Sequence, residues 1–549
     1  MEESRASITR ETKKPGQDKP AFRPLCLLNV LGKLLEHLLL NRLINETDAL
    51  SENQYGFQRG KSTIDAVERV MQIAKDVKRG PWAKRKCCVL IALDVKNAFN
   101  SAPWKGIVEA LRKKNTPEYL ISMIQSYFTN RWIEVDGKRI EVTAGVPQGS
   151  VLGPFLWNVY YDEIVSMHVP RNVEIVAYAD DIALVVTARN KCELRRLTNL
   201  VLKQINELMI RKKLELAPEK TEAILLSAKK KDRDITFQLE DVEIHPAPQL
   251  KYLGIWLDKK GKMATHVEKS LEKVNKVTKN LSRLMPNLRG PRASKRRVLC
   301  SVIHSVLLYG ATLWAVAMDT INMRDKVRKA LRPSKLRICS AYRTVSNDAL
   351  EVVSGVPPAD LMVNHRRELS SGVDREQTNN NMFRRWQQRW DPRSSHETAM
   401  WTRRLIPDVQ LWVQRKHGEV GFYVTQFLTG HGNFQAYLKR FKLKTTDACQ
   451  YCGELDSVEH TFFECPRWVT KRIELEAIIG HTLTPDNIVN AMLQSKHHWH
   501  KVENFIIQVL QQKAKDVEDE QQNTRRGRIG DRTMSREPSL AGEMRMASS

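Results

Sequence analysis

The chain has 549 residues, 42% of them hydrophobic, which is enough for more than one folded domain. Its 89 lysines and arginines against 63 aspartates and glutamates give a formal net charge of +26. This charge favours a polyanionic partner, with nucleic acid as the leading candidate, although a basic soluble protein would have the same balance. Nine cysteines in so long a chain exclude a disulfide scaffold, and no signal peptide or membrane span is predicted.

The beginning of the chain is polar and then becomes helical. Residues 1–20 are charged and contain two prolines, which predicts a flexible tail, and order is expected to begin at Phe22. Residues 54–63 contain two glycines and lead into a predicted helix over 64–77. Arg59 and Lys61 lie beside that helix start, where basic groups could meet a triphosphate. A basic, glycine-containing helix entry is more often structural, so both interpretations stay open.

An unbroken apolar run over 87–93 predicts a buried strand that ends in a single acid, Asp94, before a helix-like segment over 95–113. Further on, a strand alternation over 133–140 is interrupted by Asp-Gly and predicts a hairpin.

The predicted hairpin leads into a glycine-bounded loop over 145–149 and then into an apolar helix over 151–165. The glycines permit a ligand to approach the backbone closely. Gln148, inside the loop, offers both a donor and an acceptor to a sugar or a base.

Two apolar runs, 175–179 and 182–186, predict a hairpin of buried strands with Asp180 and Asp181 at its turn. Adjacent like charges make a poor turn, and such a misfit is expected mainly at functional sites. A solvent-exposed acidic turn is the alternative. If this hairpin pairs with the strand before Asp94, three carboxylates could hold two Mg²⁺ ions, with Mn²⁺ as a substitute, because hard cations prefer oxygen ligands.

Three motifs carry a resemblance to a known family: Asp-Val-Lys-Asn-Ala-Phe-Asn at 94–100, Gly-Val-Pro-Gln-Gly-Ser-Val-Leu-Gly-Pro at 145–154 and Ala-Tyr-Ala-Asp-Asp at 177–181. In this order they resemble the palm of the reverse transcriptases of non-LTR (LINE-type) retrotransposons. The resemblance implies an α+β right-hand polymerase fold, with fingers, a palm with an antiparallel sheet and a helical thumb. A mainly helical carboxy-terminal region with a small zinc module is expected to follow.

The resemblance and the composition together predict seven segments. They are a flexible tail at 1–20, reverse transcriptase fingers and palm at 21–258, a helical thumb-like region at 259–345, a helical connector at 346–428, a CCHC zinc knuckle at 429–480, a helical segment at 481–516 and a disordered basic tail at 517–549.

The resemblance also implies roles for single residues. Asp94, Asp180 and Asp181 are the implied catalytic and Mg²⁺-binding carboxylates. Phe99 matches the aromatic position that crowds the sugar 2′ side, and a core aromatic is the alternative. The remaining implied residues are Gln148, Arg23, Arg59 and Lys61 for the nucleotide, Tyr252, Leu253 and Gly254 for the primer grip, and Lys220, which would protonate or neutralise the leaving pyrophosphate unless it is a solvated turn residue.

Helical periodicity returns after the acidic turn. Apolar residues over 194–208 predict a helix under the sheet, and 235–244 predicts another hairpin. An apolar stripe over 267–284 is accompanied by lysines, as expected of a thumb helix that grips a duplex, or of an ordinary solvated face. Residues 366–405 show no clear period and are interpreted as a connector.

The last motif is Cys449-x2-Cys452-x7-His460-x4-Cys465. Three thiolates and an imidazole suit one tetrahedral structural Zn²⁺, with chance clustering as the alternative. The neighbouring sequence resembles the carboxy-terminal knuckle of non-LTR elements. The flanking residues proposed to bind RNA or DNA by charge and stacking are Lys439, Arg440, Lys442, Lys444, Arg467, Phe441, Phe462 and Trp468.

The predicted function is therefore RNA-dependent DNA synthesis in target-primed reverse transcription, with template RNA, a DNA primer or target DNA and dNTPs as partners. Little of the basic segment that usually precedes the Arg-Pro pair of such fingers is present. A truncated or domesticated protein that binds nucleic acid without polymerase activity is the alternative. No endonuclease domain is recognisable, so a separate endonuclease is an expected partner. The expected location is the nucleus, after synthesis in the cytoplasm.

Overall fold

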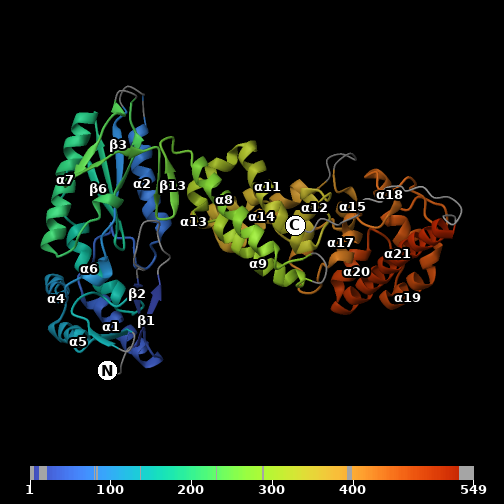
Figure 1. The fold of residues 1–549 in the computed structure, drawn as a ribbon, viewed down its shortest axis with the longest axis horizontal. Coiled ribbons are helices and arrows are strands. Elements are labelled where there is room, and N and C mark those ends of the chain that lie inside the picture. Colours follow the sequence, from blue (N-terminus) through green and yellow to red (C-terminus); the bar gives the residue numbers. More distant parts are fainter. Residues whose placement is uncertain are drawn as a thin grey trace. The chain divides into compact units, whose positions relative to one another are not determined.

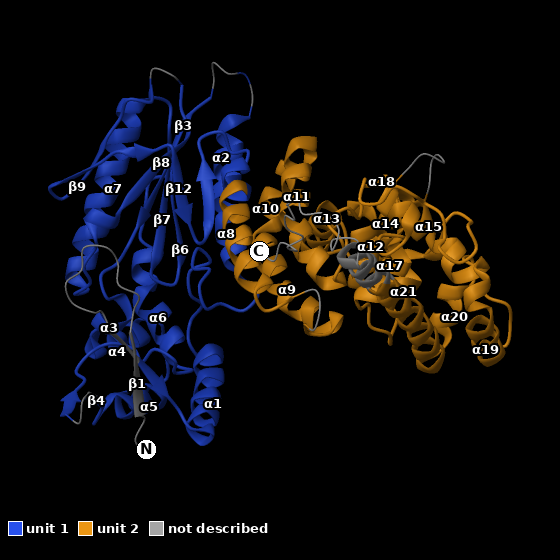
Figure 2. Ribbon diagram, turned by 45° about the vertical axis from the view of Figure 1, so that its right-hand side comes forward, with its two compact units in different colours: residues 1–267 blue, residues 268–549 orange. Residues whose placement is uncertain are grey.

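The structure is a computed structural model that describes residues 5–10, 22–79, 81, 85–135, 138–229, 232–286, 290–391 and 398–530. It divides into two compact units, residues 1–267 and residues 268–549 (Figure 2). The first unit mixes helices and strands, and the described part of the second is helical. The division falls inside the segment predicted as thumb-like.

A five-stranded sheet organises the first unit. Its strand order is β11-β8-β3-β7-β6, and every neighbouring pair is antiparallel except β11 and β8. The strands are β3 (Cys87–Leu93), β6 (Val173–Tyr178), β7 (Asp181–Ala188), β8 (Glu222–Ser227) and β11 (Pro246–Ala247). β3 lies in the middle because its apolar run is buried almost throughout.

Helices cover both faces of this sheet. α2 (Thr63–Lys78) packs against β3, β6, β7 and β8, and α7 (Lys191–Arg211) packs on β3 and β7 from the other side (Figure 1). α7 begins at an Asn190 cap and buries the predicted stripe of Leu194, Leu197, Val201, Ile205 and Leu208.

The remaining elements of the first unit are mostly hairpins and short helices. The predicted hairpins at 133–140 and 235–244 are both confirmed. The helix-like segment expected over 95–113 is interrupted instead, because Pro103 cannot continue a helix and separates α3 from α4. The elements are α1 (Val30–Glu46), α3 (Ala98–Ser101), α4 (Trp104–Lys113), α5 (Glu118–Phe128), β4 (Trp132–Val135), β5 (Lys138–Glu141), α6 (Gly153–Val165), η2 (Pro218–Lys220), β9 (Phe237–Leu239), β10 (Val242–Ile244), β12 (Gln249–Tyr252) and β13 (Ile255–Asp258).

The prediction of a flexible tail over residues 1–20 is wrong for six of them. β1 (Arg5–Arg10) pairs antiparallel with β2 (Phe22–Leu27). The strand forms although the segment has few apolar residues, because backbone hydrogen bonding to a neighbouring strand does not depend on side-chain hydrophobicity. The rest of the predicted tail lies outside the described residues.

The second unit is built from helices that bury aromatic residues. Within the connector predicted at 346–428, α14 buries Phe383, Trp386 and Trp390, so this segment has a core of its own. The elements are α8 (Ala264–Ser282), which begins before the boundary, α9 (Ala293–Leu307), α10 (Ala311–Trp314), η4 (Ala315–Asp319), α11 (Ile321–Cys339), α12 (Asn347–Ser354), α13 (Ala359–Ser370), α14 (Arg375–Trp390), α15 (Met400–Leu405), α16 (Val409–Val413), α17 (Phe422–Thr429), α18 (Gln435–Arg440), η5 (His460–Glu464), η6 (Pro466–Trp468), α19 (Val469–Ile479), α20 (Ile488–Gln494) and α21 (Lys496–Gly530).

α21 corrects the predicted disorder at 517–549, since the helix continues to Gly530. Its last part is rich in Glu, Gln, Lys and Arg, which are good helix formers, and the low hydrophobicity that suggested disorder does not oppose a helix already nucleated by the buried turns around Val502–Leu510. Residues 531–549 lie outside the described residues. Among the helices that the structure describes, none alone has the length and hydropathy to cross a membrane, and one bent pair, Ala293–Leu307 with Ala311–Asp319, passes by length and composition.

Candidate active site and metal centre

Asp94 follows the central strand directly. β3 ends at Leu93, and the backbone carbonyl of Asp94 accepts a hydrogen bond from the N–H of Ala217 (2.8 Å). Its side chain is half-buried and forms an ion pair with Lys220 on η2, with Nζ and Oδ2 2.9 Å apart. The structure therefore brings together two predicted site residues that are far apart in sequence.

The acidic hairpin lies beside Asp94. Tyr178 pairs with Asp181 across the hairpin, so the two turn residues are Ala179 and Asp180. The predicted turn was one residue too late, because Ala179 adopts a positive φ of 57° and takes the first turn position. Asp181 is the first residue of β7, and the register Leu93↔Ile182 brings Asp94 beside it.

The three carboxylates share one end of the sheet and influence one another. The pKa of Asp181 is raised to about 6, first because protein surrounds the carboxyl and removes part of its hydration, and then because Asp180 and Asp94 are close. The side chain still reaches solvent at the mouth of the site. A cation would relieve this repulsion, as the Lys220 ammonium does for Asp94.

The glycine-bounded loop packs directly against the segment that carries Phe99. The N–H of Val146 donates to the carbonyl of Phe99 (2.7 Å), and the carbonyl of Gln148 accepts from the N–H of Cys26 (2.7 Å). Gly149 has a φ of +94°, and a Cβ there would lie 2.8 Å from the carbonyl oxygen of Cys26. Only glycine fits this approach, so the loop is held in place by its backbone.

Phe99 itself is half-buried. Its ring lies 4.9 Å from the ring of Trp157 and 6.0 Å from that of Phe57, measured between centroids. Part of the Phe99 side chain therefore packs against the core, as the alternative interpretation expects. The rest is accessible, and the residue lies next to the Gln148 loop. Both descriptions are compatible with a gate.

The predicted fingers residues differ in their availability. Arg59 is exposed. The ammonium of Lys61 donates to the backbone carbonyls of Glu52 and Gln54 and lies over the ring of Tyr55. Lys61 thus stabilises its own segment in this structure. Arg23 lies in β2, and its side chain is outside the described part of the chain.

The predicted primer grip is a tight turn between β12 and β13. Leu253 and Gly254 have positive φ values of 45° and 83°. Tyr252 is 3% exposed, and burial raises the pKa of its hydroxyl. Its side chain belongs to the interior, so only Leu253, Gly254 and the backbone are accessible to a ligand at this turn.

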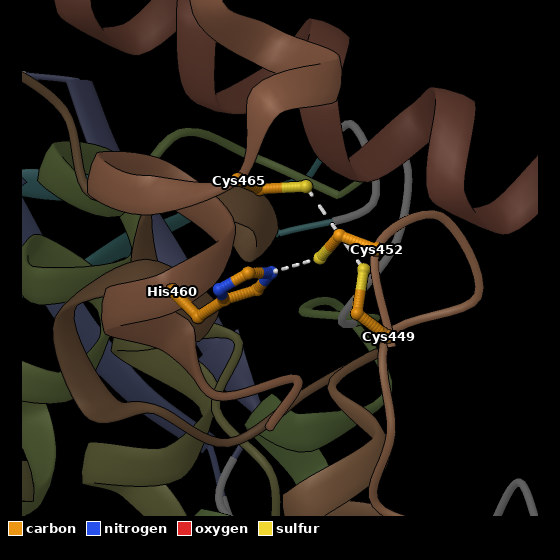
Figure 3. A group of neighbouring side chains, drawn as sticks. All are labelled: Cys449, Cys452, His460 and Cys465. Atoms are coloured by element: carbon orange, nitrogen blue, oxygen red, sulfur yellow. Dashed lines mark hydrogen bonds between the residues drawn. The ribbon is translucent and has the colours of Figure 1, made fainter. Parts of the chain in front are cut away.

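Cys449, Cys452, His460 and Cys465 converge in the second unit, with their ligand atoms all within 4.8 Å of one another (Figure 3). The Sγ atoms of Cys449 and Cys465 are 3.9 Å apart, and Sγ of Cys452 is 3.2 Å from Nε2 of His460. Two sulfurs bound tetrahedrally to one zinc lie about 3.8 Å apart, so the donor set and spacing fit Zn²⁺. Among the described residues, these four are the ones whose ligand atoms lie close enough together to hold an ion. Asp94, Asp180 and Asp181 do not meet this criterion in the structure.

A buried ion pair supports this cluster. Asp456 is 2% exposed and accepts hydrogen bonds from the N–H of Gln435 (2.8 Å) and the hydroxyl of Thr461 (2.9 Å). Lys513 on α21 contacts both its carboxylate oxygens at 2.6 and 2.9 Å. The loop between Cys452 and His460 is thereby fastened to α21.

Part of the predicted stacking surface is wrong. Phe462 and Trp468 are 1% and 4% exposed, because their rings complete the core beneath the cluster, and they are not available to bases. The guanidinium of Arg467 stacks on the ring of Tyr451 and pairs with Asp516. Phe441 remains exposed, as do Arg440 and Lys442, while Lys439 pairs with Asp447 and Lys444 is half-buried.

Sequence reasoning missed two buried polar residues next to the active site. Glu36 on α1 accepts hydrogen bonds from the N–H groups of Val151 and Leu152, just before α6. Gln54 contacts the backbone of Ala179. The role of Glu36 could have been suspected from the sequence, because a glutamate stands among leucines there. The contact of Gln54 could not, because its partner turn is 125 residues away.

The first unit has carboxylates at the ends of adjoining antiparallel strands, and a glycine-bounded loop packs against the Phe99 segment that follows Asp94. Residues 12–257 match the family model described as reverse transcriptase (RNA-dependent DNA polymerase).

Similar proteins come from retrotransposons. A 115 kDa protein in the type-1 retrotransposable element R1DM of Drosophila melanogaster is 26% identical over 532 residues, covering 91% of this chain and 50% of the relative. The Pol polyprotein from the type-1 element R1 of Bradysia coprophila is 26% identical and covers 82% and 47%. The RNA-directed DNA polymerase from the mobile element jockey of Drosophila melanogaster is 26% identical and covers 59% and 36%.

Residues 12–257 are therefore similar to reverse transcriptases, and the similar proteins come from type-1 retrotransposable elements. The chain spans about half the length of the first two relatives. Among solved structures, telomerase from Candida tropicalis in complex with a fragment of telomeric RNA aligns with a TM-score of 0.36 and 12% identity, over 69% of this chain and 64% of that one.

Proposed function

We propose that this chain is the RNA-dependent DNA polymerase of a non-LTR retrotransposon, which adds dNTPs to a primer 3′-hydroxyl during target-primed reverse transcription in the nucleus. Its proposed partners are template RNA, primer or target DNA, dNTPs and a separate endonuclease activity. The observation that carries the proposal is the junction of β3 with the β6–β7 hairpin, where Asp94, Asp180 and Asp181 lie close together, while the Gln148 loop is bonded to the Phe99 segment that follows Asp94.

The proposed cofactors at this junction are two Mg²⁺ ions, which Asp94 and Asp180 would hold with support from Asp181. Carboxylate oxygens are hard ligands. Burial first, and then the charges of Asp180 and Asp94, raise the pKa of Asp181, and divalent cations would offset this penalty on the charged carboxylate. When bound, Mg²⁺ lowers the pKa of the primer 3′-hydroxyl and stabilises the departing pyrophosphate.

The chain's own residues would orient the substrates. Gln148 and the backbone of its loop would contact the sugar and base of a nucleotide, and Phe99 would crowd a ribose 2′-hydroxyl. Lys220, which is paired with Asp94 in the structure, would be released when cations bind and could then protonate or neutralise the pyrophosphate.

The test is primer extension on a primed RNA template with Mg²⁺. Asp180→Asn should abolish extension while RNA binding stays close to that of the wild type, because the change removes one cation ligand without altering the fold. Asp241→Asn, in the exposed turn between β9 and β10, is the matched control and should extend normally. Extension by Asp180→Asn near the wild-type rate would refute the site.

We also propose that the Cys449, Cys452, His460 and Cys465 cluster holds one structural Zn²⁺ and that its surroundings bind nucleic acid. The ligand count leaves no open position for a reactive water, so a catalytic role is not expected. Burial raises the pKa of the Cys465 thiol to about 11, and a bound cation would offset this penalty for the thiolate.

Cys452→Ser should lose zinc and weaken binding to RNA and duplex DNA at matched salt, while nucleotide addition on a pre-annealed template is spared, because hard carboxylates and soft thiolates select different ions. Cys192→Ser, an exposed cysteine on α7, is the control. A full zinc content in Cys452→Ser would refute the site. Undiminished affinity in a folded, zinc-free protein would refute the binding role.

A further inference from the structure

The turn that carries Asp180 is held by one side chain from a distant segment. Gln54, just before α2, is 1% exposed. Its Oε1 accepts a hydrogen bond from the N–H of Ala179 (3.0 Å), and its Nε2 donates to the carbonyl of the same residue (3.2 Å). A single amide thus binds both polar backbone groups of Ala179, the residue with φ +57° that immediately precedes Asp180.

The backbone around Gln54 runs along β6 like an added parallel strand. The N–H of Tyr55 donates to the carbonyl of Ala177 (2.8 Å), and the N–H of Ala177 donates to the carbonyl of Asn53 (2.9 Å). At Gly56, a Cβ would lie 2.1 Å from the backbone nitrogen of Ala179. The segment therefore touches the catalytic hairpin so closely that only glycine fits there.

A left-handed alanine is unfavourable, so the Ala179 turn needs outside support to keep this conformation. If the support were removed, Ala179 could relax toward an ordinary φ, and this rotation would redirect Asp180, the next residue. The two hydrogen bonds from Gln54 are directed at the very peptide groups that would move. They act on the conformation of the turn, while the same Oε1 also accepts a hydrogen bond from the N–H of Gly56 (2.8 Å) and so orders the Gln54 segment itself.

We propose that Gln54 is a positioning residue for nucleotide addition, whose buried amide holds the Ala179 turn so that Asp180 and Asp181 face the cations. The inference rests on the proposed polymerase function. The same segment continues to Phe57, whose ring packs on Phe99, and its Gln54 carbonyl accepts a hydrogen bond from Lys61. One stretch of backbone therefore supports both the catalytic turn and the residue proposed to exclude ribonucleotides.

The first experiment compares Gln54→Met with Gln72→Met in single-turnover primer extension. Methionine keeps the length of the side chain but removes both hydrogen bonds to Ala179, together with the one that Gln54 Oε1 accepts from the N–H of Gly56 (2.8 Å). The rate of incorporation should fall about 100-fold in Gln54→Met, since a misplacement of about 1 Å can cost that much. The KM for dNTP and the affinity for primer–template should stay near wild type. Gln72, whose amide bonds only to Asp76 on the exposed face of α2, should be replaceable without effect.

A second variant tests the role through the pH dependence of activity, which a general folding defect would not change in this way. Gln54→Glu preserves shape and keeps an acceptor for Ala179, but an ionised carboxylate cannot donate to the Ala179 carbonyl. Burial should raise the pKa of this glutamate toward neutrality. Its activity relative to wild type should therefore increase as the pH falls from about 8 to about 6, while Gln54→Met stays low throughout this range.

Mn²⁺ binding, followed by the electron paramagnetic resonance signal of the free ion in zinc-loaded protein, tests the geometry without catalysis. Gln54→Met should bind Mn²⁺ more weakly than wild type, and Gln72→Met should not. If the wild type fails to extend primers, the proposed polymerase function is wrong, and Mn²⁺ affinity still decides the role of Gln54. Incorporation by Gln54→Met within about threefold of wild type, or a flat relative pH profile for Gln54→Glu, would overturn the inference.

Discussion

The ion pair between Lys513 and Asp456 should be essential to the stability of the second unit. The Lys513 side chain is 11% exposed and that of Asp456 is 3% exposed. Lys513→Met would leave the carboxylate buried without its cation, and breaking such a pair by removing one partner costs about 3–5 kcal/mol. Two hydrogen bonds, from Gln435 and Thr461, remain to the carboxylate, which places the expected loss near the lower end.

We expect Lys513→Met to lower the free energy of unfolding by about 3 kcal/mol and the Tm by about 6–12 °C for a unit of this size. The assays are urea unfolding and a thermal scan with saturating zinc. Because Asp456 lies between Cys452 and His460, the variant should also release zinc at a lower chelator concentration than the wild type. Lys515→Met, on the exposed side of the same helix, is the control and should change little.

A double-mutant cycle separates the pair from the rest of the lysine side chain. Asp456→Asn with Lys513→Met should cost less than the sum of the two single changes by about 2 kcal/mol, since the second change removes the buried charge that the first leaves uncompensated. Additive effects, or a cost below about 1 kcal/mol for Lys513→Met, would show that the charge is already compensated by its hydrogen bonds and would refute this reasoning.

Two further predictions concern Phe99 and His304. Phe99→Val should narrow the preference for dNTP over rNTP in single-turnover incorporation, because the ring edge beside the Gln148 loop is lost, and unchanged selectivity would leave Phe99 with packing alone. Burial, together with the positive charge of Lys335, lowers the pKa of His304 to about 4. Between about pH 6.5 and 4, His304 is therefore protonated in the unfolded chain but neutral in the folded chain. The free energy of unfolding is unaffected by this group above about pH 6.5 and falls by up to about 3 kcal/mol as the pH drops through this window. Urea unfolding at pH 7 and pH 5 should show a smaller loss for His304→Gln than for the wild type, and equal losses would contradict the shift.

The carboxylates could be predicted from the sequence because each follows an uninterrupted apolar run. An apolar strand such as Cys87–Leu93 is expected to be buried, so the acid that follows it is expected at the end of the sheet. The exact turn could not be predicted. Local rules place a hairpin turn by its own residues, whereas the left-handed Ala179 is held by Gln54 from another segment. Lys220 was found by its motif, but its pairing with Asp94 depends on the fold.

The convergence of Cys449, Cys452, His460 and Cys465 was predictable for a different reason, since their short spacing alone limits how far apart they can lie. Their surroundings were not. Because Phe462 and Trp468 lie near basic residues in the sequence, they were predicted to stack on nucleic-acid bases. In the structure both side chains are buried in the core beneath the cluster. An aromatic residue near a basic one has the same sequence pattern whether it is inside or outside, and only the helix that covers it, α21, decides between the two.

Of the twelve residues other than glycine that have left-handed backbone in the described chain, four lie in the segments that form the proposed active site. Phe57, Asn97, Ala179 and Leu253 have φ values between 45° and 57°, and they lie respectively in the fingers segment, before α3, in the catalytic turn and in the primer-grip turn. Each such residue costs about 1–2 kcal/mol. The cost is smaller for asparagine, which adopts this conformation more readily than the other three. Strain of this kind persists only where several contacts impose it. At Ala179 these contacts come from Gln54 and Gly56, so the fold spends stability at the position where the direction of a carboxylate must not vary.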